Sequence, residues 1–195
     1  MTLKIYRTKE HDLIKGCRQG DRNAQRELYE SYSSKMYALC YRYVRNAMEA
    51  EDIMVMAFMK VFDRIDQFKG EGSFEGWIRR IMVNESLTHL RKNRNMYLEM
   101  DIDAAMREPH YNQHEHQLEA EDLINMIREL PAGYRAVFNM YAIDGYSHKE
   151  IAEQLGITES TSKSQLNRAR AYLQKMLLNL EHVKEKKLSN DESAT

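Results

Sequence analysis

The sequence has few of the residues that interrupt helices or cross-link small domains. Its 195 residues include two prolines and eight glycines, a scarcity that favours a mostly helical chain. The two cysteines, Cys17 and Cys40, cannot build a disulfide scaffold, and without a CxxC pair they indicate no structural zinc site. We expect both to be partly buried, reduced thiols.

Long apolar runs are missing as well. No stretch approaches the ~20 residues of a membrane span, and the polar segment Met1–Glu10 lacks the apolar core of a signal peptide. The sequence therefore predicts a soluble, cytoplasmic protein with no membrane insertion. Hydrophobic residues make up 43% of the chain, which is enough for a core and argues against wholesale disorder.

Neither sign of charge is in excess, since 29 Lys and Arg face 30 Asp and Glu for a net charge of −1. Taken whole, this balance argues against a simple basic nucleic-acid binder. The sum hides three unbalanced segments, because residues 77–94 carry +4, residues 99–122 carry −7 and residues 163–187 carry +5. Random dispersal of surface charge would not usually set two basic helices around an acidic, apolar-poor segment.

The acidic segment is typical of a linker, because residues 95–117 have few strong apolar residues, one proline and weak periodicity. They include His114-Glu115-His116, but a metal site needs ligands held in fixed geometry, so we predict no metal and no other cofactor. The sequence thus predicts an all-α protein. Two small helical domains, residues 1–94 and 118–184, are joined by a flexible acidic linker and followed by a disordered tail, residues 185–195.

Hydrophobic periodicity divides the N-terminal half into helices. A short helix over residues 12–20 precedes a long one capped by Asp21. The next helix runs from about residue 49 to 66 and is apolar on more than one side. One of these sides is either core, which is the simpler interpretation, or a partner surface. After a loop with two glycines, residues 67–73, a helix with a basic last turn covers residues 74–93.

The C-terminal half predicts four helices, over residues 118–130, 132–143, 147–155 and 158–178. Ser147-His148-Lys149-Glu150 forms a capping box, and Gly156 tolerates the positive φ of a tight turn. Two helices joined by a short glycine-containing turn are the signature of a helix-turn-helix, whose second helix enters the DNA major groove.

This second helix carries polar and basic residues where it would meet DNA. Lys163 and Asn167 can reach guanine and adenine edges, and serine hydroxyls at Ser160 and Ser164 can reach bases or phosphates. Two arginines are better placed for phosphates, Arg168 and Arg170. We therefore predict that this helix reads duplex DNA.

With these motifs in place, the chain resembles the extracytoplasmic-function (ECF) sigma factors of the sigma-70 family over about residues 10–180. The C-terminal half resembles their region 4 in Leu130-Pro131, Asp144-Gly145-Tyr146-Ser147, Glu150-Ile151-Ala152 and Lys163-Ser164-Gln165-Leu166-Asn167-Arg168. The N-terminal half resembles their region 2 in Ala50-Glu51-Asp52-Ile53, Phe68-Lys69-Gly70 and Phe74-Glu75-Gly76-Trp77-Ile78-Arg79-Arg80. Both halves occur in the family's order around a linker of the right length.

The resemblance implies a transcription factor rather than an enzyme. It would bind core RNA polymerase, through the largest-subunit coiled coil and the flap, and direct it to promoter DNA. Region 4 would read the −35 element as duplex, while region 2 would melt the −10 element and capture a flipped base. The residues implied for the −10 element are Phe68, Lys69, Gly70, Arg79, Arg80, Asn84, Arg91 and Arg94. Those implied for core polymerase are Asp52, Val55, Met56 and Met59. The family commonly has an anti-sigma partner.

Three positions need further comment. A flipped base needs a stacking surface and a pliable backbone, which Phe68 and the neighbouring glycines would supply, with plain core as the alternative for Phe68. Val55-Met56 stands where many members have Gln-Glu, which implies a more apolar polymerase surface. Ser162 stands where a β-branched apolar residue is usual, which implies looser packing or a slight rotation of the reading helix.

Two other classes of protein stay open on the sequence alone. A stand-alone, dimeric helix-turn-helix regulator would explain residues 147–178 but would give no role to Phe68 or Asn84. An enzyme would have to use the His114-Glu115-His116 cluster or the carboxylates near residue 50. The chain has no glycine-rich phosphate loop, nucleophile motif or HExxH to support that class.

Overall fold

The computed structural model describes the backbone of residues 2–44, 46–93 and 120–192, and the side chains of residues 9–44, 46–93 and 122–178. Every regular element within these ranges is helical, which confirms the predicted all-α class. The chain divides into two compact units, unit 1 over residues 1–92 and unit 2 over residues 93–195. The predicted linker, residues 95–117, lies outside the described residues.

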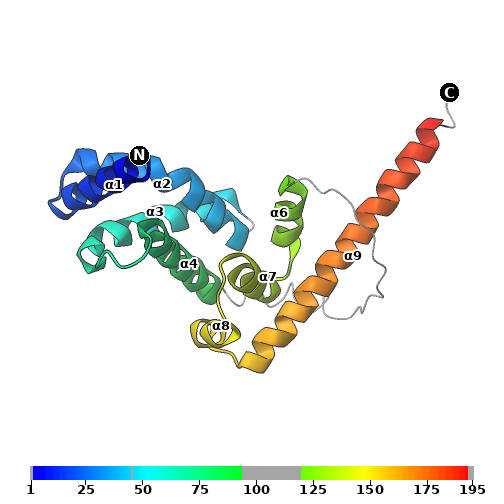
Figure 1. Ribbon diagram of the computed structural model, residues 1–195. Helices are drawn as coiled ribbons and strands as arrows, with labels where there is room; N and C mark the ends of the chain where they lie inside the picture. Colours follow the sequence, from blue (N-terminus) through cyan, green and yellow to red (C-terminus); the bar gives the residue numbers. More distant parts are fainter. Residues whose placement is uncertain (1, 45, 94–119, 193–195) are drawn as a thin grey trace. The chain divides into compact units, whose positions relative to one another are not determined.

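Within its described residues, unit 1 contains four α-helices and one short 3₁₀ helix (Figure 1). These are α1 (Thr2–Arg18), α2 (Arg22–Tyr43), α3 (Ala47–Asp63), η1 (Ile65–Gln67) and α4 (Phe74–Lys92). Asp21 caps α2 as predicted, since its Oδ1 accepts a hydrogen bond of 2.8 Å from the Asn23 N–H. Asn46 does the same for α3 through the Met48 N–H, so α3 starts slightly earlier than the acidic residues suggested.

The core of unit 1 lies where α2, α3 and α4 pack on one another in pairs, with α1 packed on α2. Fully buried side chains from each of the three helices fill it, among them Leu28, Met36, Tyr43, Ala57 and Met82. α1 is much longer than the short helix predicted over residues 12–20, and it contributes Ile14 and Cys17 to the buried set.

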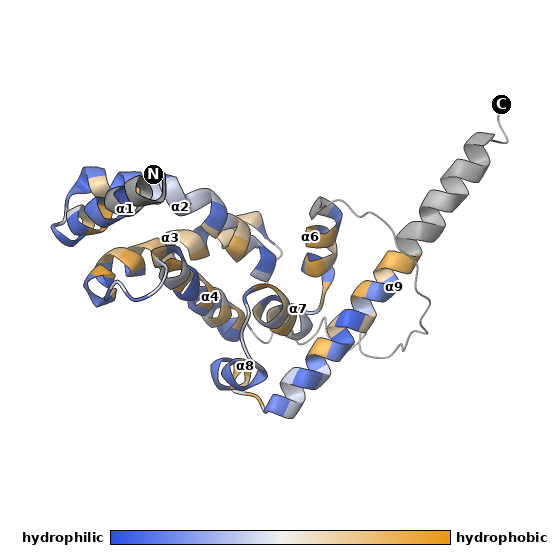
Figure 2. Ribbon diagram, in the orientation of Figure 1, coloured by the Kyte–Doolittle hydropathy of each residue, from blue (hydrophilic) through white to orange (hydrophobic). Residues whose placement is uncertain are grey.

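The described part of unit 2, residues 120–192, contains four α-helices and one π-helix. They are α6 (Ala120–Glu129), α7 (Ala132–Phe138), the π-helix η3 (Asn139–Ile143), α8 (His148–Leu155) and α9 (Glu159–Glu192). Its core cluster joins Met126 and Ile127 of α6 and the following Leu130 to Ala169 and Leu173 of α9. α9 is amphipathic over its described side chains, and hydrophilic and hydrophobic residues alternate along it in Figure 2.

A buried arginine completes the end of α6. Arg135 on α7 is fully buried, and its Nη1 donates to the carbonyls of Arg128 and Leu130, both at 2.9 Å. The last carbonyls of a helix lack partners within the helix, so a buried cation that reaches them stabilises its end. Arg135 therefore has a structural role inside the unit, which cannot be told from counting the charged residues of the sequence.

Two helix ends differ from the predicted ones. The predicted helix over residues 132–143 changes to π-type at Asn139, a buried residue whose Nδ2 donates to the Arg135 carbonyl at 3.0 Å. α9 continues to Glu192, through residues 185–192 that were predicted to be a disordered tail. Glu, Lys and Leu dominate the sequence from Glu181 to Leu188, and these residues favour helix.

Candidate nucleic-acid interface

The helix-turn-helix of unit 2 forms with the caps that the sequence predicts. Ser147 Oγ accepts from the Glu150 N–H, and Glu150 Oε2 accepts from the Ser147 N–H at 2.8 Å, so the capping box is complete. α8 ends at Gly156, whose φ of 67° lies in the left-handed region. Thr158 then begins α9 by accepting from the Thr161 N–H at 3.0 Å.

The outward face of α9 carries the six residues predicted for the −35 element. All six are exposed: Ser160, Lys163, Ser164, Asn167, Arg168 and Arg170. The first four recur at spacings of three, one and three residues, which places them on one side of the helix, while the two arginines flank it. Leu166 and Ala169 face inward and are buried. This face combines hydrogen-bonding groups for base edges with cations for phosphates.

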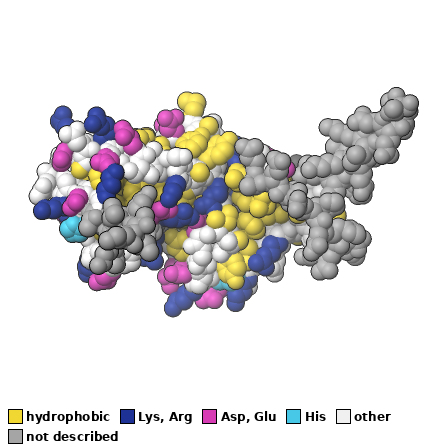
Figure 3. All heavy atoms as spheres, turned by 45° about the horizontal axis from the view of Figure 1, so that its top comes forward, with side chains coloured by type: hydrophobic (Ala, Val, Ile, Leu, Met, Phe, Trp, Pro, Cys, Tyr) yellow, Lys and Arg dark blue, Asp and Glu magenta, His cyan; other side chains and the backbone are white. Residues whose placement is uncertain are grey.

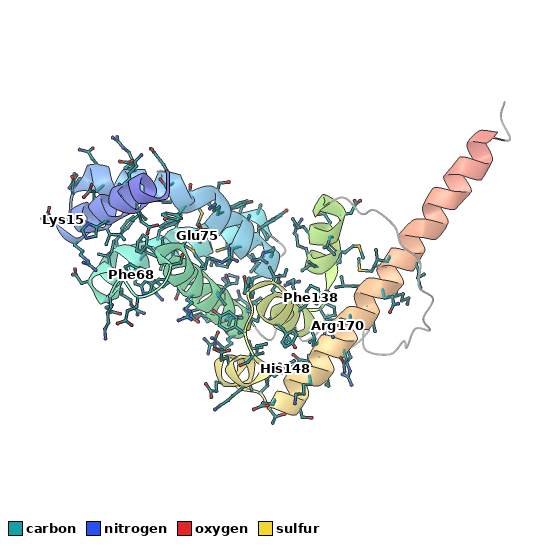
Figure 4. The ribbon with its side chains drawn as sticks, viewed as in Figure 1. Lys15, Phe68, Glu75, Phe138, His148 and Arg170 are labelled. Atoms are coloured by element: carbon teal, nitrogen blue, oxygen red, sulfur yellow. The ribbon has the colours of Figure 1, made fainter. Side chains whose placement is uncertain are left out.

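A hydrogen bond holds the inner side of α9 against α8. Ser162 is fully buried, and its Oγ shares a hydrogen bond of 2.9 Å with Nδ1 of His148. The His148 ring stacks on Tyr141 of η3, with ring centroids 4.4 Å apart and an interplanar angle of 19°. His148 is labelled on α8 in Figure 4. Sequence reasoning missed this role of His148, although an inward-facing serine signals that a polar partner is needed.

A second polar face lies on α4 of unit 1. Arg80, Asn84 and Arg91 are exposed and lie on one side of the helix together with Thr88. Arg91 Nη2 donates to Thr88 Oγ1 at 3.1 Å, which holds the guanidinium along the helix. Arg79 is half-buried on a neighbouring side, and the side chain of Arg94 lies outside the described residues.

The loop between η1 and α4 starts at a buried aromatic residue. Phe68 is 7% exposed, and its ring centroid lies 5.0 Å from that of Phe74 and 5.8 Å from that of Trp77. The ring therefore packs in the aromatic cluster of the core, which is the alternative that the sequence left open for Phe68. Figure 4 labels Phe68 on this loop and Glu75 in the first turn of α4.

The exposed part of the same loop alternates charged residues with glycines. Lys69, Gly70 and Gly72 are exposed, and the two glycines have φ values of 77° and 81°. Side-chain-bearing residues rarely adopt such φ values, so the glycines allow this path of the chain. The loop therefore presents peptide groups together with the exposed side chains of Lys69 and Glu71.

The outer face of α3 is largely apolar and exposed, so this side of the helix is not part of the core. One side of the helix is buried through Ile53, Ala57 and Val61. The other side exposes Asp52 together with apolar residues. These are Val55, Met56 and Met59, joined by Met48, which the sequence reasoning did not include. The predicted polymerase-facing residues thus form one exposed stripe at helical spacing.

Other chemistry finds little support in the part of the chain that the structure describes. Burial raises the pKa of Cys17 to about 11, aided by the nearby Asp21, and burial raises the pKa of Cys40 to about 12. Both thiols are therefore protonated at neutral pH and poorly nucleophilic. The described residues contain no group of three or more His, Cys, Asp or Glu that could hold a metal ion. The His114-Glu115-His116 cluster lies outside them.

Surface charge is mixed on the face that Figure 3 presents, where Lys and Arg lie among Asp and Glu rather than in one basic patch. Several pairs are in contact, including Lys35 with Glu75 at 2.9 Å and Lys60 with Glu85 at 2.5 Å. Nucleic-acid contacts would therefore depend on the particular faces of α4 and α9.

None of the helices in the described ranges combines the length and the apolar character needed to cross a bilayer.

Comparisons with known proteins match both units. The family model for sigma-70 region 2 matches residues 28–96, and the model for sigma-70 region 4 matches residues 120–173. The ECF RNA polymerase sigma factor SigW of Bacillus subtilis is 33% identical over 179 residues, which is 86% of this chain and 96% of that protein. The ECF RNA polymerase sigma-E factor of Escherichia coli is 28% identical over 170 residues, with 81% and 88% covered.

A solved structure shares the fold. The sigma factor RpoE from Bartonella quintana, crystallised in complex with the anti-sigma factor NepR, matches with a TM-score of 0.50 and 22% identity. The match covers 78% of this chain and 95% of that one. At this identity the likeness concerns the arrangement of helices.

Proposed function

The chain belongs to the ECF group of sigma-70 factors, and we infer from this that it is an alternative sigma factor, a non-enzymatic protein that directs promoter-specific transcription initiation. The observation that carries the inference is the joint match of regions 2 and 4, in order, on one chain. Its partners in this role are core RNA polymerase and promoter DNA. We place its action in the cytoplasm, where those partners meet.

We propose that α9 reads the −35 element. Lys163 and Asn167 are exposed on the face that a second helix of a helix-turn-helix turns toward the major groove, and their head groups suit guanine and adenine edges. Ser160 and Ser164 lie on the same face. Arg168 and Arg170 flank it, where cations can meet phosphates on either side of a groove.

We propose that the loop after η1 and the polar face of α4 act on the −10 element. Asn84 offers both a donor and an acceptor to a base edge, and Arg80 and Arg91 offer charge to the separated strand. Arg79, Lys69 and Gly70 border this area. Phe68 contributes indirectly, as the buried residue on which the loop rests.

We propose that the outer stripe of α3 binds the coiled coil of the largest polymerase subunit and that unit 2 binds the flap. Exposed methionines adapt to an apolar partner, and Asp52 adds one charged contact at the rim. Met56→Glu should weaken core binding about tenfold or more, because it places a charge inside an apolar contact. Gln19→Glu, at an exposed site just after α1, adds the same single negative charge and is the charge-matched control. Equal core binding by both variants would contradict this assignment.

The acidic linker and an anti-sigma factor complete the proposal. The linker's carboxylates suit a basic channel normally filled by RNA and would discourage binding to promoter DNA. Neutralising these carboxylates should change abortive and full-length transcript levels, and unchanged start and escape behaviour would exclude the role.

Family members commonly have an anti-sigma partner, and co-purification of this chain with a small partner protein would establish one here.

Run-off transcription with purified core polymerase tests the whole function. A sigma factor should give discrete transcripts that depend on its addition and should bind free promoter DNA weakly. A stand-alone helix-turn-helix regulator would instead protect an inverted repeat without polymerase. That alternative accounts for α8 and α9 but leaves the region 2 match without a role.

A further inference from the structure

An arginine outside the region 2 match holds one end of the loop proposed for base capture. Arg18 is the last residue of α1, and the family match begins ten residues later, at Leu28. Its Nη2 donates to the carbonyl oxygen of Phe68 at 2.5 Å, and its Nε lies 3.8 Å from Oδ1 of Asp66. The guanidinium therefore bonds to the chain where η1 ends and the loop begins.

The turn between α1 and α2 fixes the backbone position of Arg18. A Cβ on Gly16 would lie 2.6 Å from the Cβ of Ala24, so the two helices approach more closely than any larger residue allows. The Asp21 N–H donates to the Gly16 carbonyl at 3.0 Å, and Asp21 also caps α2. Because the backbone is held on both sides of the turn, the Arg18 side chain extends from a defined position.

Phe68 is held at both of its ends. Its ring is buried against Phe74 and Trp77, and its carbonyl accepts the charged hydrogen bond from Arg18. A hydrogen bond with a charged donor is stronger than one between neutral groups. Phe68 is therefore a fixed point from which the exposed loop starts.

The far end of the loop is fixed as well. Ser73 Oγ accepts from the Gly76 N–H at 3.2 Å, and the Ser73 carbonyl accepts from the Trp77 N–H at 3.1 Å, so Ser73 starts α4. Between these ends only residues 69–72 remain, and a Cβ on Gly70 or Gly72 would meet no atom within 4 Å. The conformation of this short segment thus depends on its two ends more than on contacts of its own.

We propose that Arg18 is a positioning residue for promoter melting: by holding the Phe68 carbonyl, it keeps residues 69–72 in the arrangement that receives the flipped base. This inference rests on the function proposed above for the loop. A loop that is ordered before DNA arrives loses less conformational entropy when the base enters. Arg18 thereby gives α1 a part in strand opening without touching DNA.

Two measurements on the full chain test the proposal, with Arg18→Ala and Arg18→Gln as variants. Arg26→Ala is the matched control, because it removes an exposed arginine whose side chain bonds to Asn23 on its own helix. The first measurement is hydrogen exchange of the amides of residues 69–72 in the sigma factor alone. The second is open-complex formation with core polymerase, on duplex promoters and on promoters with a pre-melted −10 element.

The expected result is faster amide exchange in residues 69–72 for both Arg18 variants and a roughly ten- to hundredfold slower opening of duplex promoters. Pre-melted promoters should be less affected, and Arg26→Ala should match the unaltered chain. Arg18→Gln keeps two of the three methylenes of the arginine stem and a polar end, so it answers the question if Arg18→Ala unfolds.

Unchanged loop exchange would overturn the proposal, whatever happens in transcription. In particular, unchanged exchange with equal losses on both promoter types would identify Arg18 as a direct phosphate contact. Faster amide exchange with normal promoter opening would also overturn the proposal. This result would show that the order of the loop does not matter for opening, which contradicts the function proposed for the loop. The exchange data therefore separate a failure of the Arg18 contact from a failure of the loop's assigned role.

Discussion

The two units present their proposed DNA-contacting groups by different means. Unit 2 displays them on one face of the regular helix α9, whose opposite face is buried through Leu166, Ala169 and Leu173. Unit 1 displays part of them on a loop whose start is buried and whose middle contains two glycines of positive φ. A helix face follows from residue spacing alone, whereas a loop exposes only what the core around it leaves free.

The largest expected effect concerns Phe68, whose burial defines the loop of unit 1. Phe68→Ala should lower the free energy of unfolding of unit 1 by about 3–5 kcal/mol, because it leaves a cavity in the aromatic cluster. Fluorescence of Trp77, the single tryptophan, follows this unit during denaturation. Asn84→Ala, at an exposed site on the same unit, should change the unfolding free energy by no more than about 0.5 kcal/mol.

The same two variants distinguish, in transcription, a residue that stabilises the fold from a residue that contacts DNA. Asn84→Ala should impair opening of duplex promoters more than that of pre-melted ones, since it removes a base contact and spares the fold. If Phe68→Ala left unit 1 as stable as before, the ring would be free for another role and the contrast between loop and helix would fail.

The next effect concerns the helix face of unit 2. Lys163→Ala combined with Arg168→Ala should reduce −35-dependent initiation about 100-fold, because one base contact and one phosphate contact are lost together. Run-off transcription at a −35-dependent promoter measures the loss. The matched control is Lys15→Ala with Arg26→Ala, which removes two exposed cations from unit 1. A loss of core polymerase binding in the α9 variant would contradict the division of labour between the units.

The fold could be predicted from the sequence where local signals suffice. The caps at Asp21 and Ser147, the turn at Gly156 and the outward face of α9 all follow from side-chain chemistry and a 3.6-residue period. The length of α1 did not follow, because its polar first half shows no strong apolar periodicity. The change to a π-helix at Asn139 did not follow either, because it depends on a buried polar contact within the folded unit.

The candidate site could be predicted from the sequence only in part. Phe68 was left between core and base contact, and its burial depends on Phe74 and Trp77, which the loop brings to it. Arg18 and His148 were missed as supports because their partners, Phe68 and Ser162, are distant along the chain and no spacing rule links them. Contacts of this kind are set by packing between elements rather than within one.

The next test concerns the hydrogen bond between His148 and Ser162 on the buried side of α9. His148→Ala should lower the stability of unit 2 by about 1–2 kcal/mol, because it leaves the Ser162 hydroxyl buried without its partner. Adding Ser162→Ala should restore part of this loss, since an apolar pair leaves no buried hydroxyl to satisfy. The measurement is the part of the far-UV circular dichroism transition that Trp77 fluorescence does not follow. Strictly additive losses in the double variant would mean that the two side chains do not interact.

The smallest expected effect concerns the cap of α8, which the sequence predicted in full. Ser147→Ala should cost about 1 kcal/mol and lower the melting temperature of unit 2 by about 4–8 °C, because the Glu150 N–H loses its acceptor. Ser147→Gly should cost only a few tenths of a kcal/mol. If Ser147→Ala instead cost more than His148→Ala, the local cap would hold the reading helix more firmly than the contact between helices does. Unit 2 would then owe its rigidity to the interactions that a sequence reveals most readily, and its difference from the loop of unit 1 would be sharper still.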